Sequence, residues 1–184
     1  MNIHSKLTSL LFASAVWNPA MAGDYTHRHH DSHVHGIAEL NIAVEGQQLL
    51  IELKSPAANI MGFEHAPKDK QQHEIVEQAA MTLKQPKQII KLPASAQCTL
   101  AYTDVESDLI DEPHKHAQHE EVEDSHSEFN VSYGFNCQNI TQLTSMEVTL
   151  FSRFAHMEKI KVQLITPDIQ RATTLSPSST KIEF

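Results

Sequence analysis

The stretch AELNIAVEGQQLLIELKSP, residues 38–56, alternates apolar and polar side chains on both sides of a single glycine. A period of two is typical of a strand that buries one face. Gly46 marks a turn between the two alternating runs. We therefore expect an antiparallel hairpin that turns at residues 45–47 and ends at Ser55-Pro56.

A helical period follows the hairpin. Residues 55–66 are expected to form a connection, and Pro67 is placed to begin a helix, because a proline in the first turn loses no hydrogen bond. The helix is expected to continue to about Lys84, before Pro86 ends it. Its apolar stripe needs a sheet to cover and consists of Ile75, Val76, Ala79 and Leu83.

The remaining apolar segments are short and mostly alternating, which predicts strands. The expected strands are 89–92, 98–103, 129–137, 147–151 and 160–165, with weaker ones at 170–175 and 180–184. This pattern favours an α+β fold, a mainly antiparallel sheet with one main helix packed on it, and a sandwich-like arrangement is the alternative. No Gly/Ser-rich or Pro-rich linker divides residues 37–184, so we expect one domain there.

The two cysteines, Cys98 and Cys137, are expected to form a disulfide if the chain is exported. Zinc ligation by the pair is the alternative. It is disfavoured because the cysteines stand alone among strand-forming residues and lack CxxC spacing.

Strand parity gives a register for this pair. If the two cysteines face each other in antiparallel strands, Leu100 faces Phe135 and Tyr102 faces Tyr133. The disulfide then ties one end of the strand pair, and residues 105–128 form a long flexible insert at the other end.

The first 22 residues have the composition of a signal peptide. A polar start with Lys6 precedes a short apolar run, residues 7–16, and Ala20 and Ala22 occupy the small-residue positions of a cleavage site. The run is shorter than the roughly 20 residues of a membrane-spanning helix. We expect cleavage after Ala22 and a periplasmic protein that does not insert in the membrane.

The chain is acidic, with a formal net charge of −9 at pH 7. Acidic proteins bind nucleic acid poorly and favour cations. We therefore expect metal ions, zinc in particular, rather than nucleic acid as partners. We also expect a monomer.

A histidine-rich arm, residues 23–36, carries the strongest local signal. Its histidines are His27, His29, His30, His33 and His35. Neutral imidazole binds zinc, nickel, copper and cobalt. An expression tag is the alternative, but a tag would not normally follow a signal peptide and lead directly into a patterned strand.

A second group of histidines stands in the insert among many Asp and Glu residues. These are His114, His116, His119 and His126. The first three form His-x-His-x-x-His, which places three imidazoles within chelating reach on a loop. A solvated acidic insert is the alternative, but acidity does not explain the clustered histidines.

Two further candidates, Glu64 and His65, stand before the expected helix. They are placed to supply ligands to a site that His33 or His35 completes. The alternative is that His65 is a hydrogen-bonded structural residue.

Two segments, residues 35–46 and 50–67, resemble the ZrgA family of zinc-regulated periplasmic proteins. The resemblance extends to the acidic, histidine-rich insert and to residues 151–154 and 162–166. It implies expression under zinc scarcity and support of zinc import.

The favoured function is therefore non-enzymatic: a periplasmic protein that captures zinc and supports its delivery to an inner-membrane importer or the binding protein of that importer. A nickel, cobalt or copper chaperone or buffer is the alternative. A zinc hydrolase is less favoured, because it needs three fixed ligands, an open coordination position and a general base, and the chain has no HExxH motif.

The two histidine groups are expected to differ in affinity. His33, His35 and His65 lie beside regular elements, so they should form the tighter site. Ordering the insert costs conformational entropy, which should weaken its sites. Both groups should lose metal below about pH 6, because protons compete for imidazole.

Overall fold

The computed structural model of the chain describes residues 34–110 and 127–184. All of them belong to one compact unit, Ser32–Phe184. The unit is mostly β-sheet with few helices, in agreement with the α+β class. No helix in the described ranges is long and apolar enough to cross a bilayer.

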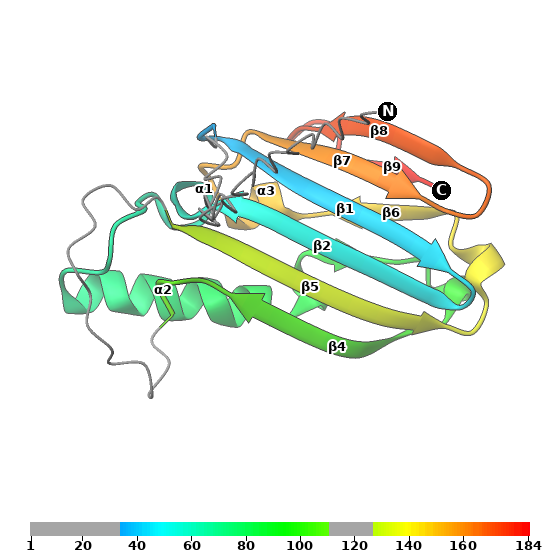
Figure 1. Cartoon of the computed structure of the whole chain (residues 1–184), viewed down its shortest axis with the longest axis horizontal. Coiled ribbons are helices and arrows are strands. Elements are labelled where there is room, and N and C mark those ends of the chain that lie inside the picture. Colours follow the sequence, from blue (N-terminus) through cyan, green and yellow to red (C-terminus); the bar gives the residue numbers. More distant parts are fainter. Residues whose placement is uncertain (1–33, 111–126) are drawn as a thin grey trace, which may run out of the picture. The chain divides into compact units, whose positions relative to one another are not determined.

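A six-stranded sheet has the order β4-β5-β2-β1-β7-β8 (Figure 1). Its strands are β1 Ile37–Glu45, β2 Gln48–Pro56, β4 Cys98–Glu106, β5 Glu128–Cys137, β7 Lys159–Ile165 and β8 Gln170–Leu175. Neighbouring strands are antiparallel except β1 and β7, which are parallel. The predicted hairpin is confirmed, since Glu45 pairs with Gln48 across the turn at Gly46.

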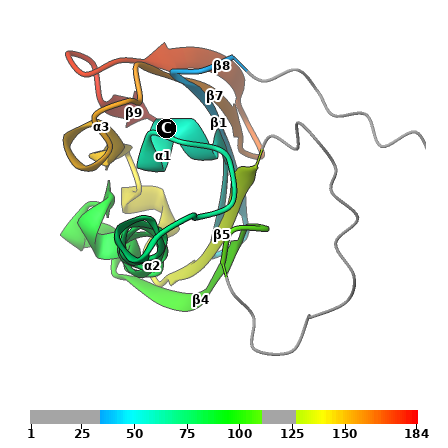
Figure 2. The ribbon, with the colours of Figure 1, turned by 90° about the vertical axis from the view of Figure 1, so that its left-hand side faces the viewer.

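A smaller sheet and the three helices found in residues 34–110 and 127–184 lie on one side of the large sheet (Figure 2). The smaller sheet has the order β3-β6-β9, with β3 Ile90–Lys91, β6 Ser145–Val148 and β9 Lys181–Glu183. The helices are α1 Ala57–Met61, α2 Lys70–Leu83 and α3 Leu150–Arg153, and three-residue 3-10 turns occur at Pro86–Gln88, Ala94–Ala96 and Ile140–Gln142. The core lies between these elements and the inner face of the large sheet.

The helix α2 buries most of the predicted apolar stripe. Val76, Ala79 and Leu83 are buried, Ile75 is half-buried, and Ala80 completes the buried face. The predicted start at Pro67 is wrong, because the helix begins at Lys70.

The start of α2 is set by an N-cap. Asp69 has an extended backbone, and its Oδ1 accepts a hydrogen bond of 2.9 Å from the Gln72 N–H. Aspartate is among the strongest N-cap residues, and this cap outweighs the preference of proline for a first helical turn.

Two further segments differ from the sequence prediction. The short helix α1 lies inside the expected connection 55–66, with Ala57, Asn59, Ile60 and Met61 buried. The expected strand 147–151 is wrong at its end: β6 stops at Val148, and α3 follows. Leu150, at the first position of α3, is buried in the core there.

The Cys98–Cys137 disulfide is confirmed, and the two cysteines face each other in register. Leu100 faces Phe135, as predicted. A β-bulge follows, so that Tyr102 faces Gly134 rather than Tyr133.

The bulge places the Tyr102 ring against Gly134. A Cβ on Gly134 would collide with the Tyr102 ring, so the glycine makes room for this aromatic side chain. The extra residue also separates the two tyrosines by face, because Tyr102 is 49 % exposed and Tyr133 is 1 % exposed.

Strands β4 and β5 bound the expected insert. β4 continues to Glu106, beyond the predicted end at Thr103, and β5 begins at Glu128. Leu109 is buried against the core. Residues 111–126 lie outside the described part of the chain.

Candidate metal-binding site

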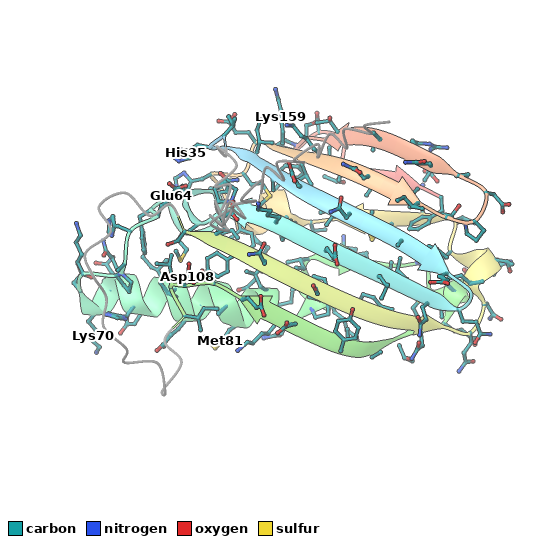
Figure 3. The ribbon with its side chains drawn as sticks, in the orientation of Figure 1. His35, Glu64, Lys70, Met81, Asp108 and Lys159 are labelled. Carbon is teal, nitrogen blue, oxygen red and sulfur yellow. A yellow bond between two sulfur atoms is a disulfide. The ribbon has the colours of Figure 1, made fainter. Side chains whose placement is uncertain are left out.

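Three chain segments meet where β1 begins. The first is residues 34–36, the second is residues 62–66 after α1, and the third is residues 156–158 before β7. The Glu158 N–H donates a hydrogen bond of 2.8 Å to the Gly36 carbonyl, and the His156 ring lies against Gly62. Figure 3 shows His35 and Glu64 at this end of the large sheet.

The central feature of the site is a pair formed by His35 and Glu64. Nε2 of His35 lies 3.0 Å from Oε1 of Glu64. The side chain of His35 is 66 % exposed, whereas that of Glu64 is 12 % exposed and its Oε1 is shielded from solvent. The carboxylate oxygen is therefore shielded from solvent, while the imidazole that faces it is mostly exposed.

The separation of these two atoms suits a shared metal ion. Two ligand atoms of one tetrahedral zinc ion, each about 2.0–2.2 Å from the metal, lie roughly 3.3–3.6 Å apart. The observed 3.0 Å is the distance of a direct His–carboxylate contact, so the two atoms would move apart slightly to admit an ion between them. An imidazole nitrogen and a carboxylate oxygen are both established zinc ligands.

The backbone that carries Glu64 is fixed by the end of α1. Gly62 caps this helix in the left-handed conformation, with φ of 85°, and its N–H donates a hydrogen bond of 2.9 Å to the Ala58 carbonyl. A Cβ at this position would lie 3.0 Å from Nε2 of His156. Glycine at this position therefore permits the left-handed turn towards Glu64 and leaves room for the His156 ring.

A carboxylate also lies beside the backbone next to His35. A Cβ on Gly36 would lie 3.0 Å from Cδ of the Glu158 side chain. Together with Glu64, Glu158 gives the start of β1 two nearby carboxylates, which favour a cation there.

His65 is exposed and has a defined ring orientation. Its ring stacks on Phe63, with centroids 5.1 Å apart, and its Nδ1 lies 2.9 Å from the Ala66 carbonyl oxygen. Because a carbonyl only accepts hydrogen bonds, Nδ1 is the donor in this contact. In the neutral ring this leaves the Nε2 lone pair free for a metal.

The structure unites only some of the predicted ligands. His35 and Glu64 lie together, but among residues 34–110 and 127–184 no three His, Cys, Asp or Glu residues are grouped closely enough to hold a metal, so His65 does not complete a trio with them. The other predicted ligands lie outside the described residues; they are His27, His29, His30, His33, His114, His116, His119 and His126. Glu64 and His65 precede α2 by several residues rather than standing at its first turn.

One residue important for this geometry was missed by sequence reasoning. Asn59 is buried in α1 and donates and accepts hydrogen bonds at the start of β1. The only signal for it is a polar side chain in the otherwise apolar run AANIM, residues 57–61.

Comparison with known proteins supports a metal-related role. A search of curated proteins gives no match. A family model described as "ZrgA family zinc uptake protein" matches residues 32–184 and confirms the resemblance seen in the sequence. This match covers the hairpin, α1 and both residues of the His35–Glu64 pair, and it indicates a role in zinc uptake. The chain belongs to the ZrgA family of zinc uptake proteins.

Proposed function

We propose that the protein captures zinc in the periplasm and supports its delivery to an inner-membrane importer or to the binding protein of that importer, without catalysing a reaction. The observation that carries the proposal is the 3.0 Å separation between Nε2 of His35 and Oε1 of Glu64. The zinc uptake family and the signal peptide expected in residues 1–22 support the same role.

The pair forms the fixed part of a site that further histidines complete. His33 precedes His35 by two residues, and two residues of extended chain span at most about 7 Å, so its imidazole is within reach of the same ion. The contact of His65 Nδ1 with the Ala66 carbonyl leaves Nε2 of the neutral ring free to bind zinc. We propose both as further ligands, together with His27, His29 and His30 of the histidine-rich arm.

Partial preorganisation suits capture and release. An ion held by two fixed residues and completed by exposed histidines exchanges without unfolding of the core. A hydrolase would need three fixed ligands and an activated water on an open position. The exposed imidazole of His35 therefore supports transfer of the ion rather than chemistry on a substrate.

The insert histidines, His114, His116, His119 and His126, are proposed as weaker additional sites. Nitrogen and oxygen donors also bind nickel, cobalt and copper(II). Both cysteines of the chain form the disulfide, so no thiolate is available for copper(I). Zinc is preferred over the remaining metals because of the family description.

Calorimetric zinc titration at neutral pH tests the site. His35→Ala and Glu64→Gln should each weaken the tightest binding event about tenfold or more, since each removes one ligand. His73→Ala is the matched control, because His73 is an exposed histidine on α2, a different element from those that carry the pair. It should change the affinity less than twofold.

A second experiment distinguishes the contributions of the two histidine groups. Deletion of residues 111–126 should remove weaker events and leave the tightest one. The deletion spares Leu109, because this side chain is buried in the core. The proposal is wrong if the deletion abolishes the tightest event while His35→Ala and Glu64→Gln leave it unchanged. A parallel nickel titration with equal or higher affinity would favour the alternative metal.

A further inference from the structure

We infer that Asn59 is a positioning residue that holds His35 opposite Glu64. This inference rests on the proposed function, because it assigns a role to Asn59 through the metal ligands. Asn59 itself does not contact the metal in this proposal. It sets the backbone from which the exposed imidazole reaches the carboxylate.

Asn59 is fully buried, with 0 % of its surface exposed, and its amide is satisfied on both sides. Its Oδ1 accepts a hydrogen bond of 2.6 Å from the Gly36 N–H. Its Nδ2 donates to the Ile37 carbonyl at 3.0 Å and to Oγ of Ser55 at 3.3 Å. A buried amide is costly without such partners, so this side chain fixes the two backbone groups that it contacts.

These backbone groups determine where His35 lies. Gly36 directly follows His35 and has φ of 82°, a left-handed conformation that turns the chain into β1. Its carbonyl accepts hydrogen bonds from the N–H groups of Glu158 and Lys159, at 2.8 and 2.9 Å. The peptide groups on both sides of Gly36 are therefore held, one by Asn59 and the other by the start of β7.

The same helix also carries the chain towards Glu64. Asn59 lies in the middle of α1, and Gly62 ends this helix two residues before Glu64. One five-residue element thus links the backbones of two ligands that are far apart in sequence. Neighbours that orient metal ligands raise affinity because less freedom is lost on binding.

A purely structural role for Asn59 predicts a different result from a positioning role. A structural residue lowers stability and affects zinc binding in the same proportion whether or not His35 is present. A positioning residue acts through His35, so its effect on zinc affinity disappears when His35 is removed. A double-mutant cycle measures this difference.

The cycle uses zinc titration of the mature full-length chain, with the four insert histidines replaced by alanine to remove overlapping events. The variants are Asn59→Ala, His35→Ala and the double substitution. Asn59→Ala should weaken the tightest zinc event about tenfold or more, as loss of a ligand-orienting residue does. In the His35→Ala background it should weaken binding less than twofold.

Tyr133→Phe is the matched control for stability. It also removes a buried hydrogen bond, from the phenol to the Leu83 carbonyl at the end of α2, and it lies away from the metal site. Zinc affinity should change less than twofold in this variant. Amide hydrogen exchange gives an independent reading, since the Gly36 N–H should lose protection in Asn59→Ala and keep it in Tyr133→Phe.

The outcomes separate the two proposals. An equal loss from Asn59→Ala in both backgrounds, or no loss in the presence of His35, overturns the positioning role alone. A neutral His35→Ala overturns the proposed site and the positioning role together. If Asn59→Ala does not fold, Ser55→Ala replaces it, because Oγ of Ser55 accepts from the Asn59 amide. A smaller loss that again vanishes without His35 is then expected, and a loss that persists without His35 contradicts the inference.

Discussion

The phenolic hydroxyl of Tyr133 in β5 donates a hydrogen bond of 2.6 Å to the backbone carbonyl of Leu83, the last residue of α2. The last carbonyls of a helix have no partner inside it, so the sheet supplies one here. Burial of the tyrosine raises the pKa of its hydroxyl well above the ordinary value. The contact ties the main helix to the sheet only while the phenol is protonated.

Alkaline pH should therefore destabilise the protein through Tyr133. Above about pH 10 the unfolded chain releases this proton while the folded chain retains it, so the unfolding free energy should fall by about 1.4 kcal/mol per pH unit. Urea denaturation between pH 9 and 11 measures the slope, and Tyr133→Phe should lack this contribution. Equal slopes for both proteins would show that another group is responsible.

Truncation of the α2 stripe should damage the core. Leu83 is fully buried, and Leu83→Ala should lower the unfolding free energy by roughly 2–4 kcal/mol. Met81 on the same helix is 54 % exposed, and Met81→Ala should cost less than about 0.5 kcal/mol. Chemical denaturation of both variants checks the difference, and similar losses would contradict the burial of this stripe.

The disulfide should dominate the stability of the β4–β5 pair. The cysteines are separated by 39 residues, and a link over such a loop contributes about 4 kcal/mol in the chain-entropy estimate. Thiol titration of the unfolded, unreduced protein should find no free thiol, and the Cys98→Ala/Cys137→Ala variant should unfold at a lower urea concentration. Two titratable thiols would show that Cys98 and Cys137 do not form a disulfide.

The close approach of the Tyr102 ring to Gly134 at the bulge in β4 predicts that substitutions of these two residues have non-additive effects on stability. Gly134→Ala should destabilise the protein by roughly 1–3 kcal/mol, because the added methyl group meets the Tyr102 ring. The same change should cost much less in a Tyr102→Ala background. Thermal unfolding of the two single variants and the double variant gives the coupling energy, and additive losses would mean that the two residues do not interact.

Zinc binding should depend on pH in a simple way. Imidazole must be neutral to bind a metal, so affinity should fall steeply below about pH 6. Titration at pH 7.5 and 5.5 checks this, with calorimetry in buffers of different ionisation enthalpy to count released protons. Affinity that is unchanged at pH 5.5 would indicate carboxylates rather than histidines as the main ligands.

The hairpin and the helix stripe were predictable because their signals are local. Alternation over residues 38–54 indicates both strands and their turn, and the spacing from Val76 to Leu83 indicates the buried helix face. The position of Tyr102 was not predictable, because parity assumes a regular ladder and the bulge adds one residue. The parallel pairing of β1 with β7 depends on contacts between distant segments, which periodicity does not reveal.

The candidate site was predictable in its residue types but not in its geometry. His35 and Glu64 were candidates because of their chemistry, whereas their proximity depends on α1 and the buried Asn59. A five-residue helix is too short to show a helical period, so its run of apolar residues reads as a connection.

The parallel pairing of β1 with β7 makes the N-terminal hairpin depend on a strand near the C-terminal end of the sequence. The β1–β2 hairpin contains only early residues, but the other edge of β1 is unpaired until residues 159–165 have been synthesised. Such an open edge invites pairing with other chains. The Gly36 carbonyl beside His35 also depends on this part of the chain, because its hydrogen-bond donors are the N–H groups of Glu158 and Lys159. A truncated chain that ends before this point therefore contains His35 and Glu64 but lacks part of the backbone framework that holds them, so the proposed metal site depends on the presence of β7.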